Sequence, residues 1–138
     1  MEVVADSSVI SKWYVMERYS EESLKLRELY VTGKVSISAP CFMPFEVINA
    51  VRRANNLSKE GLQEIVRSLY LYGFRLYPLD YFGEEAAGLA YDSELDLAEA
   101  SYLALALKRG VNLITADDLF YETWSKKFRE VKHVSSFR

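Results

Sequence analysis

Hydrophobic and polar positions follow two periods along this chain, one typical of strands and one typical of helices. Short apolar runs bounded by turn-forming residues indicate buried strands, whereas apolar positions that recur every three or four residues indicate helices. The predicted strands cover residues 2–5, 35–38, 74–78, 111–114 and 131–134. The predicted helices cover residues 9–16, 20–32, 44–56, 58–72, 82–91, 97–108 and 118–128.

Strands separated by one or two helices predict an α/β fold. Right-handed crossover connections place such strands parallel to one another, with helices on both faces of the sheet. We therefore expect a three-layer α/β/α architecture with a mostly parallel sheet of four or five strands. The chain contains no evident linker, repeat or low-complexity tract, so residues 1–138 are expected to form a single domain.

Composition favours a globular protein without a membrane segment. Half of the 138 residues are hydrophobic and 27% are charged, which argues against disorder. No run approaches the roughly 20 apolar residues of a membrane span, and the N-terminus lacks a secretion signal, so we expect a cytoplasmic protein. The single cysteine, Cys41, excludes an internal disulfide, and its apolar neighbours favour a place in the core.

Charge and histidine content limit the chemistry. A net charge of -3 gives no global attraction to nucleic acid, so such binding would need local basic patches or bound cations. His133 is the one histidine, which leaves little for a histidine-rich zinc site or a histidine-based triad.

Two aspartates, Asp6 and Asp117, each follow a predicted strand directly. The carboxyl ends of parallel strands share one edge of a sheet, so these two side chains converge if their strands are neighbours. Each has a structural alternative, because aspartate is a favoured helix N-cap. The substitution Asp6→Asn separates the two roles, since asparagine caps a helix about as well but is not an anionic metal ligand.

Two glutamates occur within apolar helices. Glu46 lies among Phe42, Phe45 and Val47, and its structural alternative is a first-turn acid that the helix dipole favours. Glu99 begins a helix that is apolar nearly all round and is expected to be buried, where a lone carboxylate is costly unless paired or coordinated. The alternative for Glu99 is a capping box that begins at Asp96.

Four acids in one cleft would repel each other and raise their pKa values unless a divalent cation neutralised them. A ligand set made only of oxygen atoms suits Mg²⁺ or Mn²⁺ and not zinc. Such ions polarise phosphate groups and activate water for attack on a phosphodiester. The acids therefore indicate phosphodiester hydrolysis.

Four blocks of the sequence, in this order and spacing, resemble the PIN domain family, specifically the VapC-type toxin ribonucleases. The resemblance extends over nearly the whole chain. The blocks are Val4-Ala5-Asp6-Ser7-Ser8-Val9-Ile10-Ser11-Lys12-Trp13, Pro44-Phe45-Glu46-Val47-Ile48-Asn49-Ala50, Tyr102-Leu103-Ala104-Leu105-Ala106 after an acid, and Leu113-Ile114-Thr115-Ala116-Asp117.

This resemblance implies the roles of particular residues. The first, second and fourth acids of the family, which bind the metal, fall on Asp6, Glu46 and Asp117. The accompanying hydroxyl groups, expected to bind the cofactor by orienting the waters of the cation, fall on Ser8 and Thr115. The third acid is normally an aspartate in a Tyr-Asp-Ala sequence, whereas this chain has Ala98-Glu99-Ala100. Glu99 keeps the charge and adds one methylene group, and Asp96 takes the position of the helix cap.

The resemblance also implies the activity and the partners. It implies an endoribonuclease that depends on Mg²⁺ or Mn²⁺, a VapB-like antitoxin that blocks the cleft, and a homodimer or higher homo-oligomer. The implied strand order is 3-2-1-4-5, which places the strands of Asp6 and Asp117 side by side.

Two other functions remain open at this point. One is a binding module without catalysis, in which the change to Glu99 has weakened the third ligand. The other is a phosphoryl-handling domain of the receiver or phosphatase type, disfavoured because two serines follow Asp6 where a second acid is expected.

Two further surfaces are open to more than one interpretation. Basic residues could contact the RNA backbone or could be solvated helix faces: Lys12, Arg52, Arg53, Lys126, Lys127 and Arg129. The aromatic segment 69–82 is interpreted as core or as a partner surface.

Overall fold

Five parallel strands form the centre of the molecule in a computed structural model that describes residues 1–137. The strand order is β3-β2-β1-β4-β5, and every neighbouring pair is parallel. The strands are β1 (Glu2–Ala5), β2 (Ser36–Pro40), β3 (Arg75–Tyr77), β4 (Asn112–Thr115) and β5 (Val131–His133). The predicted α/β class, parallel pairing and strand order are confirmed.

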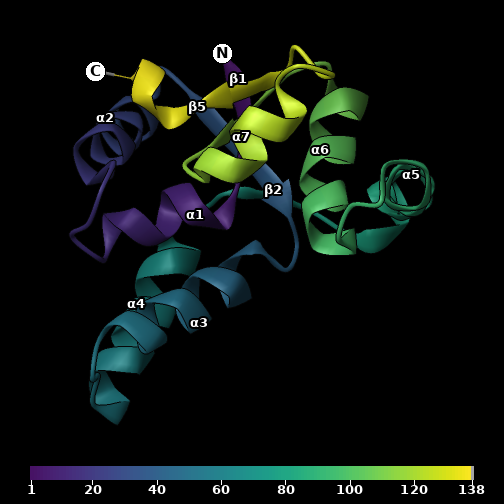
Figure 1. Cartoon of the computed structure of the whole chain (residues 1–138). Coiled ribbons are helices and arrows are strands. Elements are labelled where there is room, and N and C mark those ends of the chain that lie inside the picture. Colours follow the sequence, from purple (N-terminus) through teal and green to yellow (C-terminus); the bar gives the residue numbers. More distant parts are fainter. Residues whose placement is uncertain (138) are drawn as a thin grey trace.

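Helices cover both faces of this sheet, as a three-layer α/β/α architecture requires. In Figure 1, α5 and α6 lie on one side of the strands, α1 and α2 lie on the other, and α3 and α4 extend away together. The α-helices are α1 (Ser7–Ile10), α2 (Ser20–Val31), α3 (Met43–Ala54), α4 (Lys59–Leu71), α5 (Leu79–Ser93), α6 (Leu97–Arg109) and α7 (Asp118–Trp124), with 3₁₀-helices η1 (Ser11–Trp13) and η2 (Val134–Ser136). None of the helices within residues 1–137 could span a bilayer.

The hydrophobic core lies between the central strands and the helices packed on them. Strand β1 is the middle strand, and Val3, Val4 and Ala5 are almost completely buried. Helix α6 packs against β1, β2 and β4, and all seven of its residues from Ala100 to Ala106 are buried. Burial on two faces explains why these strands are apolar runs rather than alternating ones.

Helix ends have ordinary physical causes. The Asp96 carboxylate accepts hydrogen bonds from the amides of Ala98 and Glu99, so Asp96 is the N-cap of α6 as expected. Gly110 ends the same helix with a φ of 69°, a left-handed conformation that glycine adopts without steric cost. These caps fix where α6 begins, and therefore where Glu99 lies.

The predicted helix at residues 9–16 is too long. Helix α1 begins earlier, at Ser7, and ends at Ile10, and η1 then continues only to Trp13. The indole Nε1 of Trp13 donates to the carbonyl oxygen of Ser23, 2.8 Å away on α2. A tertiary contact therefore holds Trp13 at the point where the apolar spacing alone would have continued the helix.

Other expectations are corrected by burial. Cys41 is exposed at the turn between β2 and α3 and is not a core residue. The aromatic segment is divided: Leu69 and Phe82 are buried, whereas Tyr70 and Leu71 are exposed. The ammonium group of Lys12 already has partners within the protein, because its Nζ lies 3.0 Å from the Ser8 carbonyl oxygen and 3.2 Å from Glu17 Oε1.

Candidate functional site

All four predicted acids line one cavity at the carboxyl edge of the sheet. The cavity has a volume of about 180 Å³. Its wall consists of Asp6, Ser7, Ser8, Glu46, Asp96, Ala98, Glu99, Tyr102, Leu113, Asp117 and Phe120. The acids come from the end of β1, the first turn of α3, the first turn of α6 and the end of β4, so only the fold brings them together.

The aspartates after β1 and β4 lie at the ends of neighbouring strands. Ala5 pairs with Ile114, and the amide of Asp6 donates to the Ile114 carbonyl at 3.1 Å. Both acids also cap helices: Asp6 Oδ1 accepts from the Ser8 amide at 3.1 Å, and Asp117 Oδ1 accepts from the Phe120 amide at 3.0 Å. Capping and a place on the cavity wall are therefore compatible at both positions.

The two predicted hydroxyl residues support the turns that carry Asp6 and Asp117. Ser8 Oγ donates to Asp6 Oδ1 and accepts from the Ala116 amide at 2.9 Å, so it links the β1–α1 turn to the β4–α7 turn. Thr115 Oγ1 accepts from the Asp117 amide at 3.1 Å. Thr115 is completely buried and does not line the cavity, whereas Ser8 does.

Glu46 lies in the first turn of α3 and contacts a tyrosine from α6. The Tyr102 hydroxyl donates to Glu46 Oε1 at 2.6 Å, and the pair joins two helices that enter the cavity from different parts of the chain. Tyr102 is not among the site residues predicted from the sequence. Its signal was available, since a tyrosine three positions after Glu99 lies on the same face of α6.

Glu99 is exposed, which corrects the expectation of a buried carboxylate. The residues that follow it on α6 are buried, but Glu99 belongs to the first turn and faces the open cavity. Within residues 1–137, no hydrogen bond or ion pair of the Glu99 side chain is formed, so the reciprocal half of the capping box is absent there.

The surroundings of Asp6 and Glu99 disfavour the ionised forms of these two acids. The pKa of Asp6 is raised to about 6, mainly because burial removes water, and the charge of Asp117 adds to this. Hydrogen bonds from Ser8 and Thr115 oppose the increase. The pKa of Glu99 is also raised, first by the loss of hydration and then by Asp96, Asp117, Asp6 and Glu46. A cation in the cavity would relieve this repulsion.

The donor set fits a hydrated divalent cation. Carboxylate oxygens are the ligands that Mg²⁺ and Mn²⁺ prefer. Within residues 1–137, no three His, Cys, Asp or Glu side chains form a compact group ready to hold an ion. Mg²⁺ usually retains several of its waters and binds through one or two carboxylates, so a compact group is not required for it.

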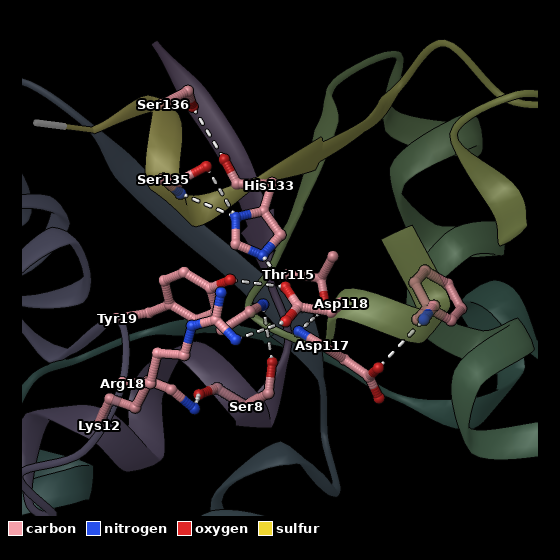
Figure 2. A network of polar contacts seen from close by, with 12 residues as sticks. Ser8, Lys12, Arg18, Tyr19, Thr115, Asp117, Asp118, His133, Ser135 and Ser136 are labelled. Carbon is pink, nitrogen blue, oxygen red and sulfur yellow. Dashed lines mark hydrogen bonds and ion pairs between the residues drawn. The ribbon is translucent and has the colours of Figure 1, made fainter. Parts of the chain in front are cut away.

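A polar network lies beside the cavity, around Asp118 (Figure 2). His133 Nε2 lies 2.9 Å from Asp118 Oδ1, and the Tyr19 hydroxyl donates to the same oxygen at 2.8 Å. His133 Nδ1 accepts from the Ser135 amide at 3.1 Å, so the ring donates through Nε2. The pKa of Asp118 is lowered, chiefly by the hydrogen bond from Tyr19. The network joins β5 and the start of α2 to the residue after Asp117.

The fold and the cavity define an α/β protein with an acidic cleft at the carboxyl ends of its two central strands. The family model of the PIN domain matches residues 3–124, so the chain belongs to the PIN domain family. No protein matches in a comparison with curated proteins.

A solved structure has the same fold. The chain is similar to VapC20 of Mycobacterium tuberculosis, described as a toxin that cleaves the sarcin-ricin loop. The TM-score is 0.66 at 12% sequence identity, and the match covers 88% of this chain and 95% of the other. At this identity the similarity demonstrates a shared fold.

Proposed function

We propose that residues 1–138 form a single nuclease domain that hydrolyses phosphodiester bonds of RNA with Mg²⁺ or Mn²⁺. One observation carries this proposal: Asp6, Glu46, Glu99 and Asp117 come from four separate elements and line a single cavity. Membership of the PIN domain family supports it, as does a structural neighbour described as a cleaving toxin.

In this proposal the four carboxylates hold the cation directly or through its waters. A bound divalent cation polarises a phosphate and lowers the pKa of water, which makes hydrolysis possible near neutral pH. Ser8 joins the turn of Asp6 to that of Asp117, and Thr115 supports the turn of Asp117 by accepting from its amide. In this proposal the two hydroxyl groups also orient the waters of the cation. The chain's one histidine, His133, does not line the cavity, so an acid and base pair of histidines is not available for attack by the 2′-hydroxyl.

The exposed cations of two segments are candidate contacts for the RNA backbone. Arg52 and Arg53 are exposed in the last turn of α3, the helix that carries Glu46 into the cavity. Neither forms an ion pair within the described part of the chain. Lys126, Lys127 and Arg129 are exposed after α7 and are the second candidate group.

The proposed biological setting is a toxin-antitoxin pair in the cytoplasm. The resemblance to VapC-type ribonucleases and the toxin fold of the neighbour support this setting. The partner would be a VapB-like antitoxin that blocks the cleft, and the toxin would form a homodimer or a higher homo-oligomer.

Cleavage of purified RNA tests the activity. The protein is incubated with unstructured and structured RNA in Mn²⁺ or in EDTA. We expect cleavage in Mn²⁺, none in EDTA, and none with Asp6→Asn, because asparagine retains the cap of α1 but lacks the anionic ligand.

A matched control is Glu28→Gln, which removes one exposed carboxylate from the far end of α2 and should cleave like the wild type. Cleavage that survives both EDTA and Asp6→Asn would reject the proposed chemistry.

A binding module with a weakened metal site is the second candidate, favoured by the exposed Glu99 in place of the family's aspartate. It predicts that Mn²⁺ leaves the melting temperature of the wild type unchanged and that Glu99→Asp gains a response. The nuclease proposal instead predicts a response of the wild type itself, measured by thermal unfolding.

A further inference from the structure

Among the described residues that line the acidic cavity, Tyr102 is the one tyrosine, and it is buried. Its side chain is 4% exposed, and its ring packs edge-on against Phe42, with the ring centres 5.6 Å apart at 84°. The hydroxyl reaches Glu46 Oε1 at 2.6 Å. Packing therefore fixes the ring, and the ring fixes the position of the hydroxyl.

This hydrogen bond restricts Glu46, whose backbone belongs to a different helix. A glutamate side chain has three rotatable bonds and loses conformational freedom when one position is selected. The bond occupies Oε1, which leaves Oε2 without a bond to any described residue and available to a ligand in the cavity. The donor is a neutral phenol, so the charge of Glu46 is retained.

The hydroxyl has one proton to donate, and the hydrogen bond to Glu46 uses it. A tyrosine phenol ordinarily loses this proton only at about pH 10, so it can serve as a hydrogen-bond donor at physiological pH.

We infer that Tyr102 is a positioning residue that orients the Glu46 carboxylate toward a divalent cation in the cavity. The inference rests on the proposed function, because it concerns the metal site proposed there. Partners that hold a ligating carboxylate from behind typically contribute about 10- to 100-fold to metal affinity. Tyr102 acts through Glu46 and does not itself contact the cation.

The experiment measures Mn²⁺ affinity by isothermal titration calorimetry for the wild type, Tyr102→Phe and Tyr30→Phe. The control is matched, because the Tyr30 hydroxyl also makes one hydrogen bond, to the Tyr72 carbonyl at 2.7 Å, away from the cavity. We expect the dissociation constant to rise by about 10-fold or more in Tyr102→Phe and to stay unchanged in Tyr30→Phe. Circular dichroism in EDTA checks that both variants are folded.

A second measurement separates positioning from a general loss of stability. The substitution Glu46→Asp withdraws the carboxylate from the phenol, so adding Tyr102→Phe to it should weaken Mn²⁺ binding no further. Equal affinity in Tyr102→Phe and Tyr30→Phe, or additive effects in the double variant, would overturn the inference while the wild type still binds Mn²⁺. Failure of the proposed function would look different, since the wild type itself would show neither binding nor cleavage.

Discussion

The two ends of strand β1 carry carboxylates with opposite electrostatic surroundings. At its start, Glu2 receives hydrogen bonds from Arg109 Nε and Nη2, each at 3.0 Å, and from Ser38 Oγ at 2.7 Å. These contacts lower the pKa of Glu2, with the Arg109 hydrogen bond as the largest cause. At the other end, Asp6 faces further acids, and its pKa is raised to about 6.

The difference shows which end contributes to stability and which is available for binding. At Glu2 the charge is neutralised within the protein, so no external partner is required. At Asp6 the charge is desolvated and repelled by Asp117, so ionisation of Asp6 costs free energy that a bound cation would offset. Uncompensated charge on a shared strand is thus a physical marker of the functional edge.

Among substitutions at the two ends of β1, the largest effect we expect is on the stabilisation of the protein by Mn²⁺. Saturating Mn²⁺, at 100 times its dissociation constant, should stabilise the wild type by about 2.7 kcal/mol. Asp6→Asn should lose this response, while Glu2→Gln should keep it because Glu2 lies at the opposite edge. Thermal unfolding with and without Mn²⁺ measures both. A response of equal size in the two variants would contradict the assignment of the functional edge.

A smaller effect concerns the protein without metal. Because the pKa of Asp6 is raised from its ordinary 3.8 to about 6, the ionised form penalises folding. The favourable contribution of the protonated form is complete below pH 3.8 and is lost as the pH rises through about 6. Asp6→Asn should therefore be more stable than the wild type in EDTA at pH 7.5, by about 1 to 3 kcal/mol.

Urea unfolding in EDTA at several pH values measures the gap in unfolding free energy between Asp6→Asn and the wild type. The gap should open between pH 4 and 7 and stay constant above that range. A gap that is independent of pH would show that Asp6 is not the group responsible.

The smallest effect on stability is expected at the start of β1, where Arg109 neutralises Glu2. Glu2 and Arg109 are partly exposed, at 17% and 27% of their side chains, so solvent screens their interaction. Glu2→Gln should cost about 1 kcal/mol or less in unfolding free energy. Since the pKa of Glu2 is lowered, its contribution is present above the ordinary value of 4.5 and is lost as the pH falls below it.

Chemical denaturation at pH 7 and pH 3 measures the contribution of Glu2, with Glu28→Gln as an exposed carboxylate for comparison. A larger effect of Glu2→Gln at pH 3 than at pH 7 would reverse the predicted sign.

Local sequence pattern was sufficient to predict the α/β class and the place of Asp6 and Asp117 at strand ends, whereas the strand order that makes those strands neighbours came from the family resemblance. The apolar runs around Val3 and Leu113 identify the central strands, and the aspartates that end those runs must lie where parallel strands end. The placement of Glu46 and Glu99 on the same cavity wall came from the family resemblance, because nothing in the spacing of 53 residues between them specifies a contact.

Contacts between distant residues could not be predicted. The ion pair of Glu2 and Arg109 joins positions 107 apart, and the bond of Tyr19 to Asp118 joins positions 99 apart. The early end of α1 and the exposure of Glu99 both depend on how neighbouring elements pack. Packing, and not helical propensity, determines where such a helix ends and which of its side chains contact water.

The hydrogen bonds of Ser8 restrain one side of the cavity more than the other. One hydroxyl group connects the ends of two strands and so restrains the side of the cavity that carries Asp6 and Asp117, whereas no described residue holds the Glu99 side chain by a hydrogen bond. A ligand that enters the cavity would meet a restrained side with Asp6 and Asp117 and an unrestrained carboxylate, Glu99. Adjustment to ligands of different size would then fall to Glu99.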